Sequence, residues 1–156
     1  MDKKVFCFDM DGTIADLYAV ENWLPKLRAH DASPYMEAKP MLNLSALARQ
    51  LNAAQRKGAK IIIISWASRD PDPGFFDDVI AAKMEWLAEH LPSVQWDEVF
   101  VTPYGRDKAQ HCGVDGANFC LFDDEERNRN RWEELDGLAF NPSDITEILK
   151  QFNRGK

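Results

Sequence analysis

The feature of this sequence that most constrains its fold is a set of three short apolar runs, each followed at once by polar residues. The runs cover residues 5–8, 61–64 and 119–122. They are continuous rather than alternating and rich in β-branched or aromatic residues, which is typical of strands buried on both faces of a parallel sheet. Residues 99–101 and 138–140 are weaker strand candidates of the same type.

Segments with a helical repeat of apolar residues separate these runs. The repeat covers residues 44–51, 76–91 and 145–152. Ser143 is the predicted N-cap of the last of these helices, and residues 71–74, which are rich in proline and glycine, predict a loop before the second. Because strand and helix alternate, we expect an α/β fold, a Rossmann-like three-layer sandwich with a mainly parallel sheet.

The segment 14–41 does not follow this alternation. It contains three prolines around one predicted short helix near residues 20–29. We therefore expect a short, irregular, cap-like insertion after the first strand. The chain has 156 residues with no internal repeat or linker, so a single domain over residues 1–156 is expected.

Composition excludes several classes of protein. The formal net charge of −7 disfavours attraction to nucleic acid or to an anionic membrane surface. No apolar run approaches the roughly 20 residues of a membrane span, and the N-terminus has no secretory apolar stretch, so we expect a cytoplasmic protein without a membrane partner. Three cysteines without a close pair and three histidines without ligand spacing predict neither a disulfide framework nor a zinc site.

The polar residues that follow the apolar runs are the candidate site. Asp9 and Asp11 follow the first run, Ser65 the second, and Asp123 with Asp124 the third. A single ending of this kind is commonly a turn or a cap. Ligands of open α/β sheets bind at the carboxyl ends of the strands, so three such endings predict one shared site.

The clustering of these carboxylates would require a cation. Two carboxylates about 4 Å apart repel each other by roughly 4 kcal/mol at an effective dielectric constant near 20. Oxygen ligands without clustered histidine or cysteine favour Mg²⁺ over zinc or copper, and Mg²⁺ commonly binds one or two carboxylates together with a substrate phosphate. The sequence therefore predicts a Mg²⁺ site and a small phosphorylated substrate.

The sequence DMDGT at residues 9–13 resembles the opening motif of the haloacid dehalogenase-like hydrolase superfamily. Three further segments match the later motifs in order. Residues 61–65 resemble the second motif, Lys108 the third, and residues 121–124 the fourth. The resemblance spans nearly the whole chain, and its first motif is the most specific.

The resemblance implies a two-step phosphoryl transfer. Asp9 is the implied nucleophile, which forms an aspartyl phosphate. Asp11 is the implied general acid and base. Ser65 is expected to hydrogen-bond a phosphoryl oxygen, and Lys108 to offset negative charge, with Arg106 as the alternative to Lys108.

The resemblance also implies the ligands of the metal and the neighbours of the substrate. Mg²⁺ is expected at Asp9, at the backbone carbonyl of Asp11 and at Asp123, with Asp124 as a direct ligand or as a partner of one. The predicted substrate-binding residues are Gly12, whose backbone N–H is expected to face phosphate, Thr13, and Trp66 and Arg69, which lie near the predicted mouth of the site. Aromatic side chains near the predicted mouth suit either stacking on a nucleobase or packing within the insertion: Tyr18, Trp23, Tyr35 and Trp66.

Several functions remain open at this point. The acidic pair after the third run and the short insertion are similar to the deoxyribonucleotidase branch and to the phosphatase domain of polynucleotide kinases. The first hypothesis is a Mg²⁺-dependent phosphohydrolase acting on a small phosphomonoester such as a nucleotide. The alternatives are a polynucleotide phosphatase, a phosphotransferase with an acceptor other than water, and a catalytically silent relative that binds phosphate or a protein.

Overall fold

The computed structural model describes residues 3–155 and contains a parallel sheet of five strands. The strand order is β5-β4-β1-β6-β7, and every neighbouring pair is parallel. The strands are β1 (Val5–Phe8), β4 (Lys60–Trp66), β5 (Glu98–Thr102), β6 (Phe119–Phe122) and β7 (Leu138–Phe140). The three main strand predictions and both weaker ones are therefore confirmed, as is the mainly parallel α/β fold.

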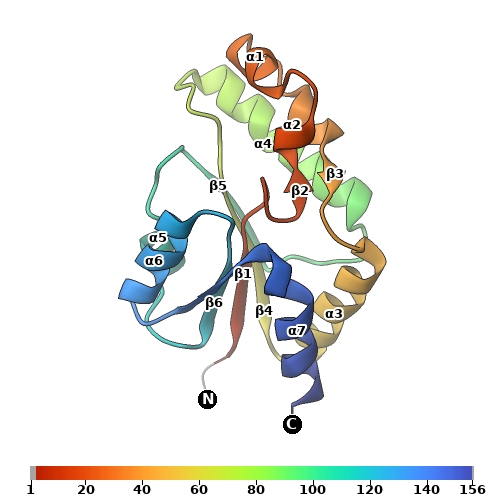
Figure 1. Cartoon of the computed structure of the whole chain (residues 1–156), viewed down its shortest axis with the longest axis vertical. Helices are drawn as coiled ribbons and strands as arrows, with labels where there is room; N and C mark the ends of the chain where they lie inside the picture. The colour runs from red at the N-terminus through yellow and green to blue at the C-terminus, as the bar shows by residue number, and fades with distance from the viewer. Residues whose placement is uncertain (1–2, 156) are drawn as a thin grey trace.

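Helices cover both faces of the sheet (Figure 1). Alternate residues of β1 point to opposite faces, so Phe6 and Phe8 belong to one core cluster and Val5 and Cys7 to another. The first face packs against α3 (Leu44–Arg56) and α7 (Ile145–Arg154), and the second against α5 (Lys108–Cys112) and α6 (Glu126–Glu134). This arrangement is the predicted three-layer sandwich.

The insertion has more regular structure than the single helix predicted near residues 20–29. It contains η1 (Leu17–Ala19), α1 (Trp23–Arg28), α2 (Ser33–Glu37), and a two-residue antiparallel ribbon of β2 (Ala15–Asp16) and β3 (Lys39–Pro40). These short elements pack on α4 (Pro73–His90) through a third apolar cluster, and Figure 1 shows them gathered around α4 beyond one end of the sheet. The indole N–H of Trp86 in α4 donates to the carbonyl of Ala38, 2.7 Å away.

Two predicted helix starts were wrong. Proline is favoured in the first turn of a helix, so Pro73 and Gly74 begin α4 instead of forming a loop, and Asp72 caps it by accepting from the backbone N–H of Phe75. Ser143 lies inside a short 3-10 turn (Pro142–Asp144), and Asp144 occupies the N-cap position of α7. Among the helices of residues 3–155, none has the length and apolar character that a membrane crossing requires.

Candidate active site

The parallel register places Asp9 and Asp123 side by side. Phe8 pairs with Phe122 in the ladder between β1 and β6, so the next residue of each strand is an aspartate at the same edge of the sheet. The backbone N–H of Asp9 donates to the carbonyl of Phe122 at 3.0 Å, which extends the ladder up to the site. This edge is the carboxyl end of the sheet, where the sequence placed the candidate residues.

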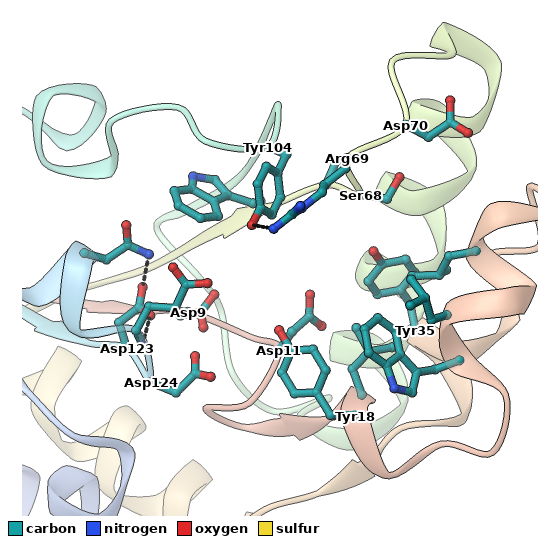
Figure 2. A pocket seen from close by; sticks show the side chains of 18 of the residues that line it. Asp9, Asp11, Tyr18, Tyr35, Ser68, Arg69, Asp70, Tyr104, Asp123 and Asp124 are labelled. Carbon is teal, nitrogen blue, oxygen red and sulfur yellow. Dashed lines mark hydrogen bonds between the residues drawn. The ribbon is translucent and has the colours of Figure 1, made fainter.

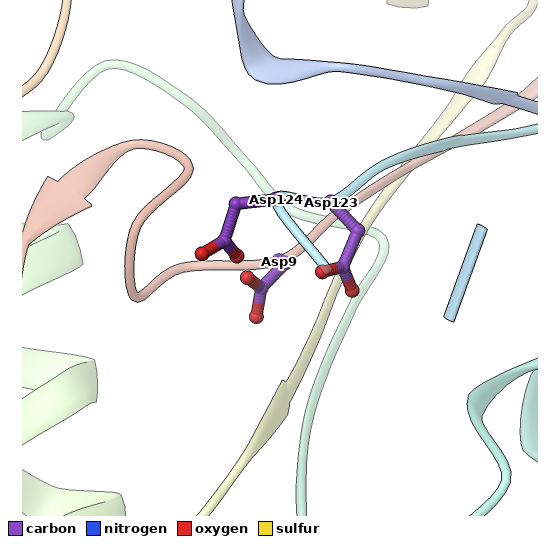
Figure 3. Close-up of side chains that lie close together, drawn as sticks. All are labelled: Asp9, Asp123 and Asp124. Atoms are coloured by element: carbon purple, nitrogen blue, oxygen red, sulfur yellow. The ribbon is translucent and has the colours of Figure 1, made fainter. Parts of the chain in front are cut away.

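Asp9, Asp123 and Asp124 form what is called here the acidic cluster. One carboxylate oxygen of each lies within 4.8 Å of the others, and Figure 3 shows the three side chains facing a common point. Burial and repulsion by Asp9 raise the pKa of Asp123 to about 6 and that of Asp124 to about 8. Three converging carboxylates are a donor set that suits a hard divalent cation such as Mg²⁺.

Lys108 lies between two of these carboxylates. Its Nζ is 3.0 Å from Oδ1 of Asp9 and 2.8 Å from Oδ2 of Asp123, and the side chain is buried. Burial alone would lower the pKa of Lys108, but the two carboxylates raise it above its ordinary value, so the ammonium stays charged. Arg106, the alternative to Lys108, has an exposed side chain and contributes only its carbonyl, which accepts from the indole N–H of Trp66.

Thr13 and Gly12 support the acidic cluster from the turn after β1. The hydroxyl of Thr13 donates to Oδ2 of Asp9 at 3.0 Å. Gly12 has φ +77°, and a Cβ on it would lie 2.3 Å from Oδ2 of Asp124, so glycine permits both the turn and the approach of Asp124. The N–H of Gly12 donates to the carbonyl of Ala15, so the expectation that it faces phosphate does not hold.

Asp11 is separate from the acidic cluster. Its Oδ2 accepts from Nζ of Lys83 at 2.8 Å. Burial raises the pKa of Asp11 above its ordinary value, although the ammonium of Lys83 opposes the shift. A carboxyl group with a raised pKa has the property required of a general acid.

The structure does not place Ser65 at the cavity. Its side chain is fully buried in β4, and its Oγ accepts from Nζ of Lys83 at 2.6 Å. The serine that lines the cavity is Ser68, in the loop after β4. The motif assignment therefore chose the serine inside the strand, because the sequence does not show that β4 continues through Trp66.

Sequence reasoning missed two buried residues, Lys83 and Asn128. Lys83 lies four residues after Val79 and four before Leu87, which are both on the apolar face of α4. A lysine within an apolar helical stripe could therefore have indicated that Lys83 is buried. Asn128 donates to Oδ2 of Asp123 at 3.1 Å, and it lies in a highly charged helix that carried no signal for a buried amide.

A cavity of about 750 Å³ connects these groups to the insertion. Tyr18, Trp23 and Tyr35 line its far side and are called here the aromatic wall; Figure 2 shows Asp11 between this side and the acidic cluster. Tyr18 is 50% exposed, whereas Tyr35 is 4% exposed and packs within the insertion. Tyr35 therefore fits the expectation of packing, whereas stacking of a substrate on the exposed ring of Tyr18 stays a prediction.

Trp66 and Arg69 also line the cavity. The indole ring of Trp66 has Nζ of Lys108 and the guanidinium of Arg127 about 5 Å from its centroid, at 5.1 and 4.9 Å. Arg69 donates to the hydroxyl of Tyr104 at 3.0 Å (Figure 2), and it makes no ion pair within residues 3–155. Within the described residues, Arg69 is therefore a cation of the cavity lining that has no ion-pair partner.

No protein-family model matches the chain, and no curated protein sequence matches it significantly. Solved structures do match. The D,D-heptose 1,7-bisphosphate phosphatase from Burkholderia thailandensis aligns with 13% identity and a TM-score of 0.60 over 96% of this chain and 98% of that one. The D,D-heptose 1,7-bisphosphate phosphatase from B. bronchiseptica, complexed with magnesium and phosphate, aligns with 14% identity and a TM-score of 0.62 over 97% and 98%. At these identities the likeness shows the fold, which this chain shares with those two phosphatases.

Proposed function

We propose that this protein is a Mg²⁺-dependent phosphohydrolase that cleaves a small phosphomonoester through an aspartyl-phosphate intermediate on Asp9. The observation that carries the proposal is the convergence of the acidic cluster, Lys108 and Asp11 at one cavity. The resemblance of residues 9–13 to the opening motif of the haloacid dehalogenase-like superfamily supports it. The fold shared with two phosphatases, one of them complexed with magnesium and phosphate, supports it further.

The first step is the transfer of the phosphoryl group to Asp9. A carboxylate oxygen of Asp9 forms a bond to phosphorus, and the bond between phosphorus and the ester oxygen breaks. The departing oxygen takes its proton from the carboxyl group of Asp11, whose pKa is raised by burial.

The second step releases phosphate. A water oxygen attacks phosphorus, and Asp11, now a carboxylate, takes the water proton. The bond between phosphorus and Asp9 then breaks, which restores both side chains to their initial state. An alcohol in place of water would make the protein a phosphotransferase.

The surrounding groups stabilise charge during both steps. The Lys108 ammonium contacts Asp9 and is placed to offset negative charge on the phosphoryl group. Ser68 replaces Ser65 as the proposed hydroxyl donor to a phosphoryl oxygen, because it lines the cavity. The acidic cluster and the backbone carbonyl of Asp11 would hold Mg²⁺, which would supply Lewis-acid stabilisation of the phosphoryl oxygens.

The finer proposal concerns the substrate, for which we infer a planar aromatic group such as the base of a mononucleotide. Tyr18 presents a half-exposed ring in the aromatic wall, and Arg69 supplies a cation that makes no ion pair among residues 3–155. A polynucleotide phosphatase is the second candidate, which the net charge of −7 disfavours. Turnover of a free mononucleotide but not of a nicked duplex is the expected result.

The test is a screen of phosphorylated metabolites with Mg²⁺, in which Asp9→Asn is the blank. Asp77→Asn, an exposed aspartate of α4 outside the cavity, is the matched control and should keep full activity. Full turnover by Asp9→Asn would remove Asp9 from the nucleophile role. If the folded wild-type protein turns over no phosphate ester with Mg²⁺ at any pH, a catalytically silent binding protein is the better description.

A further inference from the structure

Lys83 is a buried lysine that the chemistry proposed above does not use. It lies in the middle of α4, its residue is 1% exposed, and its Nζ is 4.8 Å from the centroid of the Tyr35 ring. Burying a lysine is costly unless its charge is paired and its hydrogen bonds are made. Its position under the active site therefore requires a structural reason, which the contacts of its ammonium provide.

The ammonium of Lys83 has three protons and three acceptors. It donates to Oδ2 of Asp11 at 2.8 Å, to Oγ of Ser65 at 2.6 Å and to the carbonyl of Trp66 at 2.7 Å. Two of these acceptors belong to β4, which is held in the sheet between β1 and β5. The sheet therefore fixes the ammonium, and the ammonium fixes one oxygen of Asp11.

We propose that Lys83 is a positioning residue, which anchors the carboxyl group of Asp11 to β4 and leaves the other Asp11 oxygen to face the leaving group. Asp11 follows β1 in the turn that continues into the insertion, so its own backbone does not tie it to the sheet ladder. Proton transfer requires the carboxyl oxygen to be within hydrogen-bond reach of the departing oxygen. Ser65 is buried and does not line the cavity, so its hydroxyl holds the Lys83 ammonium and does not contact the substrate.

This inference rests on the proposed phosphohydrolase function, and the leaving group provides its readout. Phosphotransfer from 4-nitrophenyl phosphate needs little help from a general acid, because its leaving group is a weak base. Benzyl phosphate also carries one aromatic ring, but its leaving alkoxide must be protonated. A loss of Asp11 positioning should therefore lower kcat/KM for benzyl phosphate more than for 4-nitrophenyl phosphate.

The variants are Lys83→Met and Lys83→Gln, measured with Mg²⁺ and both esters. We expect kcat/KM for benzyl phosphate to fall at least about tenfold further than kcat/KM for 4-nitrophenyl phosphate, since a general acid contributes about 10²- to 10⁴-fold. The control is Lys57→Met, which removes another lysine that donates to protein carbonyls, including that of Asn153 at 2.6 Å, far from the cavity. Equal losses on the two esters, or no loss, overturn the proposal.

A second measurement uses proteins that keep the lysine and does not depend on the stability of the Lys83 variants. In protein labelled with ¹⁵N-lysine, the ammonium signal of Lys83 should shift in both Asp11→Asn and Ser65→Ala, while the signals of exposed lysines stay in place. An unmoved Lys83 signal in either variant overturns the anchor. Wild-type protein that turns over no phosphate ester with Mg²⁺ refutes the proposed function, whereas the ammonium signals still decide whether Lys83 joins Asp11 to β4.

Discussion

The acidic cluster and the aromatic wall line the same cavity, but they are held in place differently. In the acidic cluster, Asp9 accepts from Lys108 and Thr13, and Asp123 accepts from Lys108 and Asn128. In the aromatic wall, Tyr18 is half exposed and meets Trp23 only edge to face, at 5.1 Å between ring centroids. Groups fixed by several charged hydrogen bonds are preorganised for chemistry, whereas a weakly constrained ring suits recognition.

This difference predicts two kinds of mutant. Changes in the acidic cluster should lower kcat, because they remove interactions made with the reacting atoms. Changes in the aromatic wall should raise KM and leave kcat nearly unaltered, because they remove binding made equally in the ground and transition states. A large loss of kcat in a mutant of the aromatic wall would contradict this division of roles.

The largest effect is expected for Lys108→Met. The variant leaves Asp9 and Asp123 without the cation between them, and kcat should fall about 10²- to 10³-fold, the range seen when a preorganised charge donor is lost. Stability should also fall by about 3–5 kcal/mol, because a buried ion pair loses one partner. Turnover of 4-nitrophenyl phosphate and urea unfolding measure the two losses.

Arg106→Met is the matched control for Lys108→Met. Arg106 lies in the loop two residues before Lys108, but its side chain is exposed, so turnover and the urea midpoint should stay near the wild-type values. If Arg106→Met were the more damaging change, the assignment of the cation to Lys108 would be wrong.

The second prediction concerns Mg²⁺ and the stability of the acidic cluster. A ligand present at about 100 times its Kd stabilises a protein by about 2.7 kcal/mol, which corresponds to a rise in Tm of about 5–10 °C for a chain of this length. We expect a gain of this size at pH 8 for protein first treated with chelator. Differential scanning calorimetry with and without Mg²⁺ measures it, and the gain should disappear in Asp124→Asn.

The pH dependence of the chelator-treated protein follows from the same carboxylates. The pKa values of Asp123 (about 6) and Asp124 (about 8) in the folded protein lie above the value of about 3.9 for an unfolded aspartate. Their contribution to stability is therefore complete below pH about 4 and is lost as the pH rises through 6 and then 8. Asp124→Asn should remove the upper part of this decline, and a decline that is unchanged in the variant would contradict the pKa assigned to Asp124.

The third prediction concerns the aromatic wall. Tyr18→Ala should raise KM for a mononucleotide about tenfold, equivalent to about 1.4 kcal/mol, through loss of a stacking face. kcat should change little, and KM for an aliphatic phosphate should be unaffected. Met84→Ala, an exposed residue of α4 outside the cavity, is the control. An equal rise in KM for both classes of substrate would argue against an aromatic group in the substrate.

The sheet was predictable from the sequence because its strands are buried on both faces, which leaves continuous apolar runs. Asp9, Asp11, Asp123 and Asp124 were predictable for the same reason, since each follows the end of a run. Parallel strands end at a common edge, so strand ends alone identified the candidate site before any contact was known.

The groups that the sequence did not predict reach the site from positions other than strand ends. Lys83 comes from the buried face of α4 and Asn128 from a charged helix, and which acceptor each one meets is decided by packing between distant segments. Ser65 lies inside β4 and not after it, because an apolar run alone does not show at which residue a strand ends. The insertion was underestimated because its helices and strands are too short for a helical or strand repeat to be recognised in the sequence.

The smallest effect is expected for the N-cap at the start of α5. Its loss tests whether the cap only stabilises the helix or also holds Lys108 in place for the reaction. Asp107 caps this helix by accepting from the N–H groups of Ala109 and Gln110, and Asn43 caps α3 in the same way, away from the cavity. Asp107→Ala and Asn43→Ala should each lower stability by about 1 kcal/mol, or about 2–4 °C in Tm.

Only Asp107→Ala should also reduce kcat, by a few fold, because Lys108 is the first residue of the helix that the cap holds. The carboxylate of Asp107 also accepts from Nε of Arg131 in α6 at 2.8 Å, so Asp107→Ala also removes a contact between α5 and α6. Equal stability losses with unequal kcat would show that rate depends on how firmly the ammonium is held between Asp9 and Asp123. Equal kcat in the two variants would mean that the paired carboxylates alone keep Lys108 in place.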